Sequence, residues 1–110
     1  MGLAAPAAVP VEVISADRRV FRLSHEIGPG GLRLQKPAPF EPGRPVKVRF
    51  ALPGQSLRLE VEAEVAVTGD PVEQDGEKGG LGITFREPTP ETRAFITSYV
   101  SERLGLPPLP

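Results

Sequence analysis

Apolar and polar residues alternate along much of the chain, most regularly between residues 57 and 67. Every second residue there is apolar, and most residues between them are charged. A helix has a period of 3.6 residues and cannot produce this alternation, whereas the side chains of a strand point to opposite faces in turn. The segment therefore predicts a half-buried antiparallel strand. Its apolar face consists of Leu57, Leu59, Val61, Ala63, Val65 and Val67, and its polar face of Arg58, Glu60, Glu62 and Glu64.

A second strand is expected just before it, between residues 46 and 50. Val, Val and Phe alternate there with two cations, Lys47 and Arg49, and a Pro-Gly turn at residues 52–55 follows. If the two strands pair, both cations lie opposite glutamates. Exposed ion pairs contribute only a few tenths of a kcal/mol each, so we expect these pairs to determine register rather than to supply stability.

The remaining expected strands are shorter. Residues 9–13 and 20–24 predict a first hairpin around a turn at 16–18, and residues 32–35 and 81–85 add two more strands. The proline-rich segment 36–43 between them predicts a loop, with Phe40 anchoring it to the core.

The period changes at Thr89, which predicts a helix after the last strand. Thr89 is a suitable N-cap, Pro90 suits the first helical position, and Gly105 ends the pattern. An apolar stripe at helical spacing must cover the core. The stripe consists of Phe95, Ile96, Tyr99, Val100 and Leu104. About six short strands followed by one helix predict an all-β fold: a small antiparallel barrel or sandwich with the helix closing an open side.

Composition narrows the functional classes. The 110 residues suffice for one domain, and the formal net charge of -1 gives no general attraction to nucleic acid or anionic lipid. Cysteine is absent, and no apolar run approaches the length of a membrane span. We expect residues 1–8 to be a disordered lead-in, 9–105 the folded domain and 106–110 a proline-rich tail. The alanine-rich start lacks a basic region, so we expect a cytoplasmic protein without membrane insertion.

The stretch from Glu26 to Leu34 reads EIGPGGLRL and combines three glycines with a proline. It predicts a compact turn, because glycine accepts positive φ and proline presets its own. A turn that exposes backbone N–H groups beside arginines can receive phosphate oxygens. The alternative is a plain glycine-rich connection between two strands.

Four segments together resemble the PilZ domain family. They are EIGPGGLRL at 26–34, PGRPVKVRFALPG at 42–54, LRLEVEAEV at 57–65 and GGLGITF at 79–85. The resemblance extends from Val9 to Leu104 and implies a six-stranded antiparallel β-barrel capped by a C-terminal α-helix. Many members of that family bind cyclic di-GMP, and some instead act as protein-binding modules.

Two motifs carry nucleotide binding in that family, and both are degenerate here. The first is Asp or Asn, any residue, Ser, any two residues, Gly, and it aligns with Glu26, Gly28 and Gly31. Glu26 keeps the carboxylate at the end of a longer side chain, Gly28 has no hydroxyl, and only Gly31 matches outright. The second motif is an arginine pair before the first strand, and no arginine precedes Val9.

The resemblance therefore implies a regulatory adaptor that acts through protein–protein interaction, with no cofactor and with cyclic di-GMP not favoured. The alternative is a cyclic di-GMP receptor with a shifted arginine pair, since Arg18 and Arg22 have the motif's spacing but follow the first strand.

The candidate partner surface consists of the arginines around the glycine-rich turn, because guanidinium groups suit both phosphate and carboxylate. They are Arg18, Arg19, Arg22 and Arg33. Like charges held together repel, so we expect an acidic protein segment as counter-charge. A homodimer is the competing use, with the acidic stretch Asp70–Glu77 of a second copy in that role.

No arrangement of residues predicts an enzyme or a metal site. His25, the only histidine, lacks a marked nucleophile or acid partner and is expected on an exposed strand end. Asp70, Glu73, Asp75 and Glu77 do not follow the EF-hand ligand spacing. We therefore expect no catalytic residue and no nucleic-acid partner.

Overall fold

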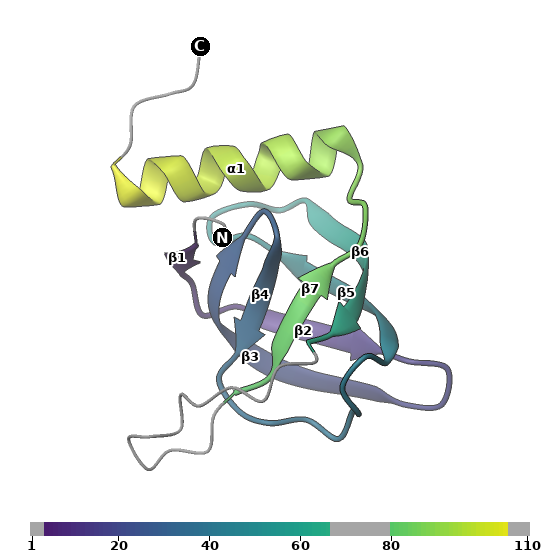
Figure 1. The fold of residues 1–110 in the computed structure, drawn as a ribbon. Coiled ribbons are helices and arrows are strands. Elements are labelled where there is room, and N and C mark those ends of the chain that lie inside the picture. Colours follow the sequence, from purple (N-terminus) through teal and green to yellow (C-terminus); the bar gives the residue numbers. More distant parts are fainter. Residues whose placement is uncertain (1–3, 67–79, 106–110) are drawn as a thin grey trace.

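The computed structural model describes residues 4–66 and 80–105 and shows a β-barrel with one helix (Figure 1). The elements are β1 (Ala5–Pro6), β2 (Pro10–Ile14), β3 (Arg19–Gly28), β4 (Gly31–Leu34), β5 (Pro45–Ala51), β6 (Arg58–Val65), β7 (Gly82–Phe85) and α1 (Pro90–Leu104).

All strand pairs are antiparallel, and the strand order is β1-β3-β2-β5-β6-β7-β4. An additional pairing of β3 with β4 closes β2–β7 into a barrel and leaves β1 as an extra strand. The predicted six-stranded barrel with a C-terminal helix is therefore confirmed.

The lead-in expected to be disordered instead contains a short strand, β1, within its described residues 4–8. β1 pairs with the second half of β3, Ala5 with Ile27 and Pro6 with Glu26, while β2 pairs with the first half. Ala5 and Ala7 are buried. That expectation is wrong for these residues, because the edge of β3 offers hydrogen bonds to a segment that lacks any strand pattern of its own.

Ser24 joins β1 and β2 where they meet beside β3. Its hydroxyl accepts from the Val9 amide at 3.0 Å and donates to the Ala7 carbonyl oxygen. The Ser24 amide donates to the carbonyl oxygen of Val9 at 2.9 Å, and the Ser24 side chain is completely buried. The hydroxyl thus satisfies backbone groups that the regular ladder leaves unpaired.

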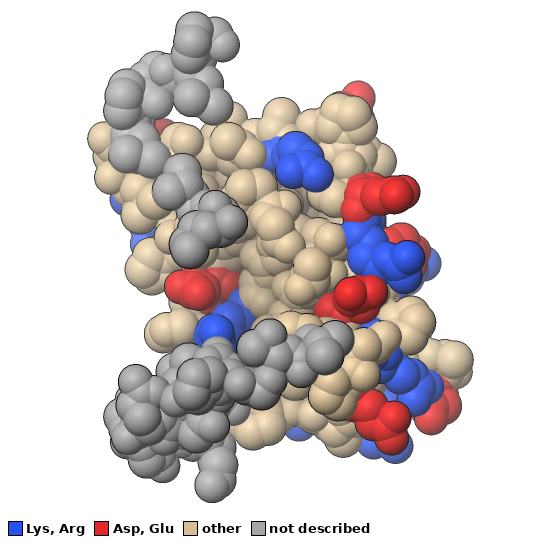
Figure 2. All heavy atoms as spheres, viewed as in Figure 1, with Lys and Arg blue, Asp and Glu red and all other residues tan. Residues whose placement is uncertain are grey.

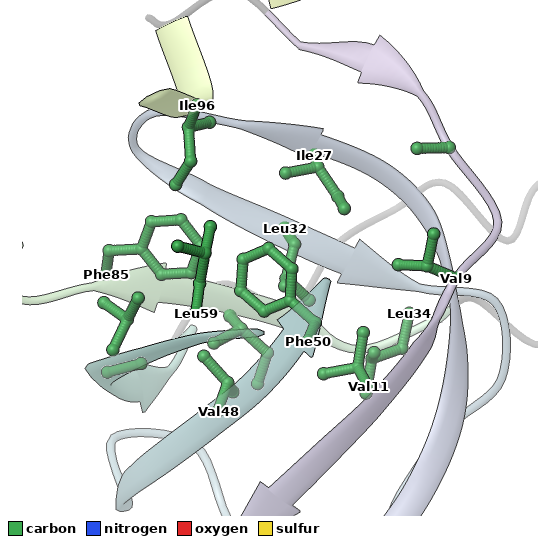
Figure 3. Packing of buried hydrophobic residues seen from close by; sticks show 14 of the residues in the cluster. Val9, Val11, Ile27, Leu32, Leu34, Val48, Phe50, Leu59, Phe85 and Ile96 are labelled. Atoms are coloured by element: carbon green, nitrogen blue, oxygen red, sulfur yellow. The ribbon is translucent and has the colours of Figure 1, made fainter. Parts of the chain in front are cut away.

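The core consists of the side chains that point inward from the strands, and these fill the barrel (Figure 3). Phe50 and Phe85 stack across it, with ring centres 6.1 Å apart, and Phe40 is buried as expected. Leu57, expected on the apolar face, is 56% exposed because β6 begins only at Arg58. Val67, the acidic stretch 70–77 and the tail 106–110 lie outside the described residues.

The predicted helix is confirmed together with both of its ends. Thr89 accepts a hydrogen bond from the Thr92 amide at 3.1 Å, and Gly105 ends the helix with φ 72°. α1 contacts β1 and β3 and crosses the end of the barrel where β3 turns into β4 (Figure 1). Ile96 points into that end, above Ile27 and Phe85 in the view of Figure 3.

The helical stripe is narrower than expected. Ile96, Tyr99 and Val100 are buried, Phe95 is partly buried, and Leu104 is 40% exposed. The Tyr99 hydroxyl has no hydrogen-bond partner among the described residues. Its ring therefore contributes through packing and through the Arg103 guanidinium, which lies 5.9 Å from the ring centre.

The expected ion pairs across β5 and β6 are present. Lys47 lies opposite Glu62 and Arg49 opposite Glu60. The Lys47 ammonium is 3.0 Å from Glu60 and 3.7 Å from Glu62, and Arg49 donates to Glu60 at 3.1 Å. Hydrogen bonding between Lys47 and Glu60 lowers the pKa of Glu60 and raises the pKa of Lys47.

Candidate functional site

The glycine-rich stretch forms a tight hairpin rather than an open loop. β3 continues through Gly28, which pairs with Gly31, so the turn consists of Pro29 and Gly30 alone. Glu26 is a strand residue, paired with Arg33 on β4 and Pro6 on β1. The expected row of free N–H groups is therefore absent from the described hairpin, since proline has no N–H and Gly30 is the only amide donor of the turn.

Gly31 is required by strand packing. A Cβ atom at this position would lie 2.1 Å from the carbonyl oxygen of Ile83 on β7. β4 and β7 pair at this point, with Gly31 opposite Thr84. The one position that fully matches the nucleotide motif thus has a structural reason that needs no ligand.

A shallow pocket of about 180 Å³ lies beside this hairpin, and we call it the hairpin pocket. Glu26 and Arg33 line it, and their nearest oxygen and nitrogen are 4.0 Å apart. Ala4, next to β1, lines the same pocket. Its lining therefore contains one carboxylate and one guanidinium group, and the neighbouring residues 4–8, Ala-Ala-Pro-Ala-Ala, add no positive charge.

The four arginines of the candidate partner surface do not form one cluster. Arg18 lies in the β2–β3 turn and Arg19 at the start of β3. Arg33 lies opposite Glu26, and the stretch of β3 from Arg19 to Glu26 spans roughly 20 Å at about 3.3 Å per residue. The expectation of a single arginine patch around the glycine-rich turn is wrong, because β3 continues much further than the sequence pattern indicated.

Partners within the chain already hold three of these guanidinium groups. Arg19 lies 2.9 Å from Glu12, and Arg33 lies beside Glu26. Arg22 donates to the carbonyl oxygens of Pro37 at 3.0 Å and Phe21 at 2.9 Å. Arg19 and Arg33 therefore have a counter-charge within the chain, and the argument that they need an external one fails. Acidic and basic side chains also lie next to one another on the face shown in Figure 2.

Two further observations concern the turn of the first hairpin and His25. Asp17 accepts from the Ser15 hydroxyl at 2.9 Å and from Arg44 at 2.8 Å, and both contacts lower the pKa of its carboxyl. His25 is exposed, as expected, but lies at a β-bulge between Ser24 and Glu26 rather than at a strand end.

The described residues contain no group of three or more His, Asp or Glu side chains that could hold a metal ion. Within the same residues, no helix is long and apolar enough to cross a membrane.

Sequence reasoning missed a second surface feature, on the outer face of β2, β3 and β5. Phe21 is 62% exposed and lines a hollow of about 330 Å³, and Leu23, on the same face of β3, is 48% exposed. The sequence does contain a signal: both residues lie on the face of β3 opposite Val20 and Ser24, so β3 carries apolar side chains on both faces. Neighbouring large apolar residues on a solvent face make this surface a candidate contact surface.

Comparison with known proteins gives one family and a set of similar folds. The family model described as PilZ domain matches residues 5–102. The Bacillus subtilis inhibitor of motility, MotI/DgrA, is similar with a TM-score of 0.74 and 21% identity over 94% of this chain and 50% of that protein. The PilZ domain of CeSA from a cellulose-synthesizing bacterium has a TM-score of 0.64 and 20% identity over 90% of this chain and 95% of that one.

At these identities, the likeness to solved structures shows the fold alone. This chain spans only half the length of MotI/DgrA. None of the curated proteins compared with the chain matches it.

Proposed function

Because the chain belongs to the PilZ family, we propose that it is a regulatory adaptor domain that binds a protein partner and does not bind cyclic di-GMP in the family's mode. The proposal includes no catalytic role and locates the domain in the bacterial cytoplasm.

The side chains in and around the hairpin pocket are the main support for this proposal. The position that supplies a serine hydroxyl in nucleotide-binding members is Gly28, and the carboxylate of Glu26 faces Arg33 at 4.0 Å. Gly31 is explained by the approach of Ile83. Opposite Glu26, where the family's arginine pair would approach, β1 presents Ala5 and Pro6. The hairpin pocket therefore offers few groups that could bind two phosphate groups.

The contacts of Arg22 favour this proposal over the shifted arginine pair. Arg22 is held by the carbonyl oxygens of Pro37 and Phe21, so a phosphate would have to displace both hydrogen bonds. An adaptor role is also compatible with the name of one similar protein, an inhibitor of motility, which describes regulation rather than catalysis.

Calorimetric titration with cyclic di-GMP tests the nucleotide half of this proposal. Charge-assisted hydrogen bonds to phosphate are worth about 1.5–3 kcal/mol each, so a micromolar site that lacks two of them is weakened by at least about a hundredfold. We expect no binding in the micromolar range. Affinity of a few micromolar or tighter would contradict the proposal, and loss of that affinity in Arg18→Ala and Arg22→Ala would then identify the shifted pair as the receptor site.

Cross-linking in cells, followed by reconstitution with the purified cross-linked protein, tests the adaptor half. We expect a saturable complex that forms equally well with and without cyclic di-GMP. A complex that requires the nucleotide would contradict the proposal.

A further inference from the structure

The outer face of β2, β3 and β5 combines exposed apolar side chains with charged ones. Phe21 lies opposite Glu12 and Leu23 opposite Pro10, while Glu12 also lies opposite Arg49. Directly opposed residues of antiparallel strands point to the same face of a sheet. Since Val11 and Val13 fill the barrel, these side chains face outward.

The hollow on this face has a volume of about 330 Å³, and we call it the outer-face hollow. Its lining includes Pro10, Phe21, Arg49, Ala51, Leu52 and Arg58. Ligand pockets in proteins begin at about 300 Å³, so the hollow is large enough to take an apolar side chain with neighbouring atoms.

Some charged side chains around the outer-face hollow have ionic partners within the chain and others do not. The carboxylate of Glu12 is only 9% exposed and is shared by Arg19 at 2.9 Å and Arg49 at 3.8 Å. Arg49 is also bound by Glu60 at 3.1 Å. Arg58, paired in register with Ala51, has no ionic partner in the part of the chain that the structure describes. The accessible charge at the rim is therefore positive.

Resting on the adaptor function proposed above, we propose that the outer-face hollow is the docking site for an acidic peptide segment of the protein partner. An apolar side chain of the segment enters beside Phe21, and a neighbouring carboxylate pairs with Arg58. Interface centres are enriched in aromatic residues and arginine, and buried aromatic anchors supply much of the binding energy.

A second copy of this chain is a poorer occupant of the same surface. In a two-fold symmetric contact, each residue near the axis meets its own copy or a close neighbour. A contact centred on the outer-face hollow would bring two copies of Arg58 toward each other, and like charges across an interface oppose binding. An acidic segment instead supplies the missing counter-charge.

Fluorescence anisotropy with three labelled peptides of equal length tests the site. The first alternates Glu and Asp with Leu and Phe, the second replaces Leu and Phe by Ser, and the third replaces the acidic residues by Lys. We expect the acidic apolar peptide to bind at least about tenfold more tightly than the other two. Phe21→Ser and Arg58→Glu should each weaken its binding by about tenfold or more, and Arg58→Glu should shift the preference toward the lysine peptide.

Matched control variants distinguish binding at this site from non-specific electrostatic or hydrophobic binding. Arg93→Glu makes the same charge change at an exposed position of α1, and Leu104→Ser removes an exposed leucine at the C-terminal end of α1. Both should bind the acidic apolar peptide like the wild type. Circular dichroism melting checks the fold of every variant, and Arg58→Gln replaces Arg58→Glu if the latter does not fold.

Equal binding of the three peptides, or wild-type affinity in both Phe21→Ser and Arg58→Glu, would overturn this site. A wild-type dimer in sedimentation equilibrium that Phe21→Ser makes monomeric would overturn it in favour of a second copy. If the cross-linked partner binds both variants as tightly as the wild type, the adaptor function stands and this site fails. Micromolar binding of cyclic di-GMP would instead contradict the proposed function, whatever the peptides do.

Discussion

At the residue scale, Ser24 has the most specific structural role. Its buried hydroxyl bonds both Val9 and Ala7, and thereby holds β1 and β2 on the same edge of β3. Ser24→Ala leaves these backbone groups without partners, and a buried unsatisfied group costs about 1–3 kcal/mol. Urea denaturation should show a loss of this size. Ser56→Ala, at an exposed loop position, is the matched control, and an equal effect of the two substitutions would contradict the role of Ser24.

The arginines show where residue-scale prediction from sequence ends. Their number and spacing are visible in the sequence, but their counter-ions are not. Glu12 pairs with Arg19 because β2 and β3 adopt one particular register, and Arg22 finds the Pro37 carbonyl across a loop that carries no pattern. Glu26, Gly28 and Gly31 were identified from the resemblance alone, and only the structure shows that Gly31 serves the contact with β7.

At the scale of single elements, the helix can be tested with two neighbouring side chains. Ile96 is fully buried and points into the barrel end, whereas Phe95 is only partly buried. Ile→Ala at a buried site costs about 2–5 kcal/mol, so Ile96→Ala should reduce the free energy of unfolding by an amount in this range. Phe95→Ala should cost less, although it removes the larger side chain. Chemical denaturation of both variants checks the order, and the reverse order would show that the helix packs through another face.

Elements with local signals were predicted correctly, and elements made by tertiary contacts were not. α1 is specified by its cap, its proline and its final glycine, and β5 and β6 by alternation with charged partners. β1 consists of an alanine and a proline, which have no strand periodicity; it exists because it pairs with β3 and because Ser24 holds the segment that follows it. β3 runs to Gly28 through a bulge at His25, which interrupts the period of two.

At the scale of the whole molecule, closure of the barrel brings together features that are far apart in the sequence. The pairing of β3 with β4 completes the barrel and creates the hairpin pocket, while the pairing of β2 with β3 and β5 assembles the outer-face hollow. The resemblance to the PilZ family pointed to the hairpin pocket, because the residues of the family motif lie close together in the sequence. The outer-face hollow depends on the register of four strands, β3, β2, β5 and β6, and therefore requires the structure.

The cross-strand ion pairs make the stability of the whole barrel depend on pH in a defined direction. The pKa of Glu60 lies below its ordinary value of 4.5 because Lys47 donates a hydrogen bond to it, so ionised Glu60 stabilises the folded state above this pH. That contribution disappears as the pH falls through the lowered pKa. Asp17, with its pKa lowered from 3.8 by the Ser15 hydroxyl, acts in the same direction. Lys47 contributes fully below its ordinary value of 10.5 and loses its contribution as the pH rises through its raised pKa.

Urea denaturation across this pH range should therefore give a plateau between two declining limbs. Glu60→Gln should flatten the acidic limb, because the substituted side chain no longer titrates, and should weaken the alkaline limb through loss of the bond to Lys47. Glu41→Gln, at an exposed position in the loop before β5, removes one carboxylate without touching the ion pairs or a helix end and is the matched control. All these groups are exposed, so salt should reduce the difference between the two variants. Parallel pH curves for the wild type and Glu60→Gln would show that the ion pairs add nothing to the stability of the barrel.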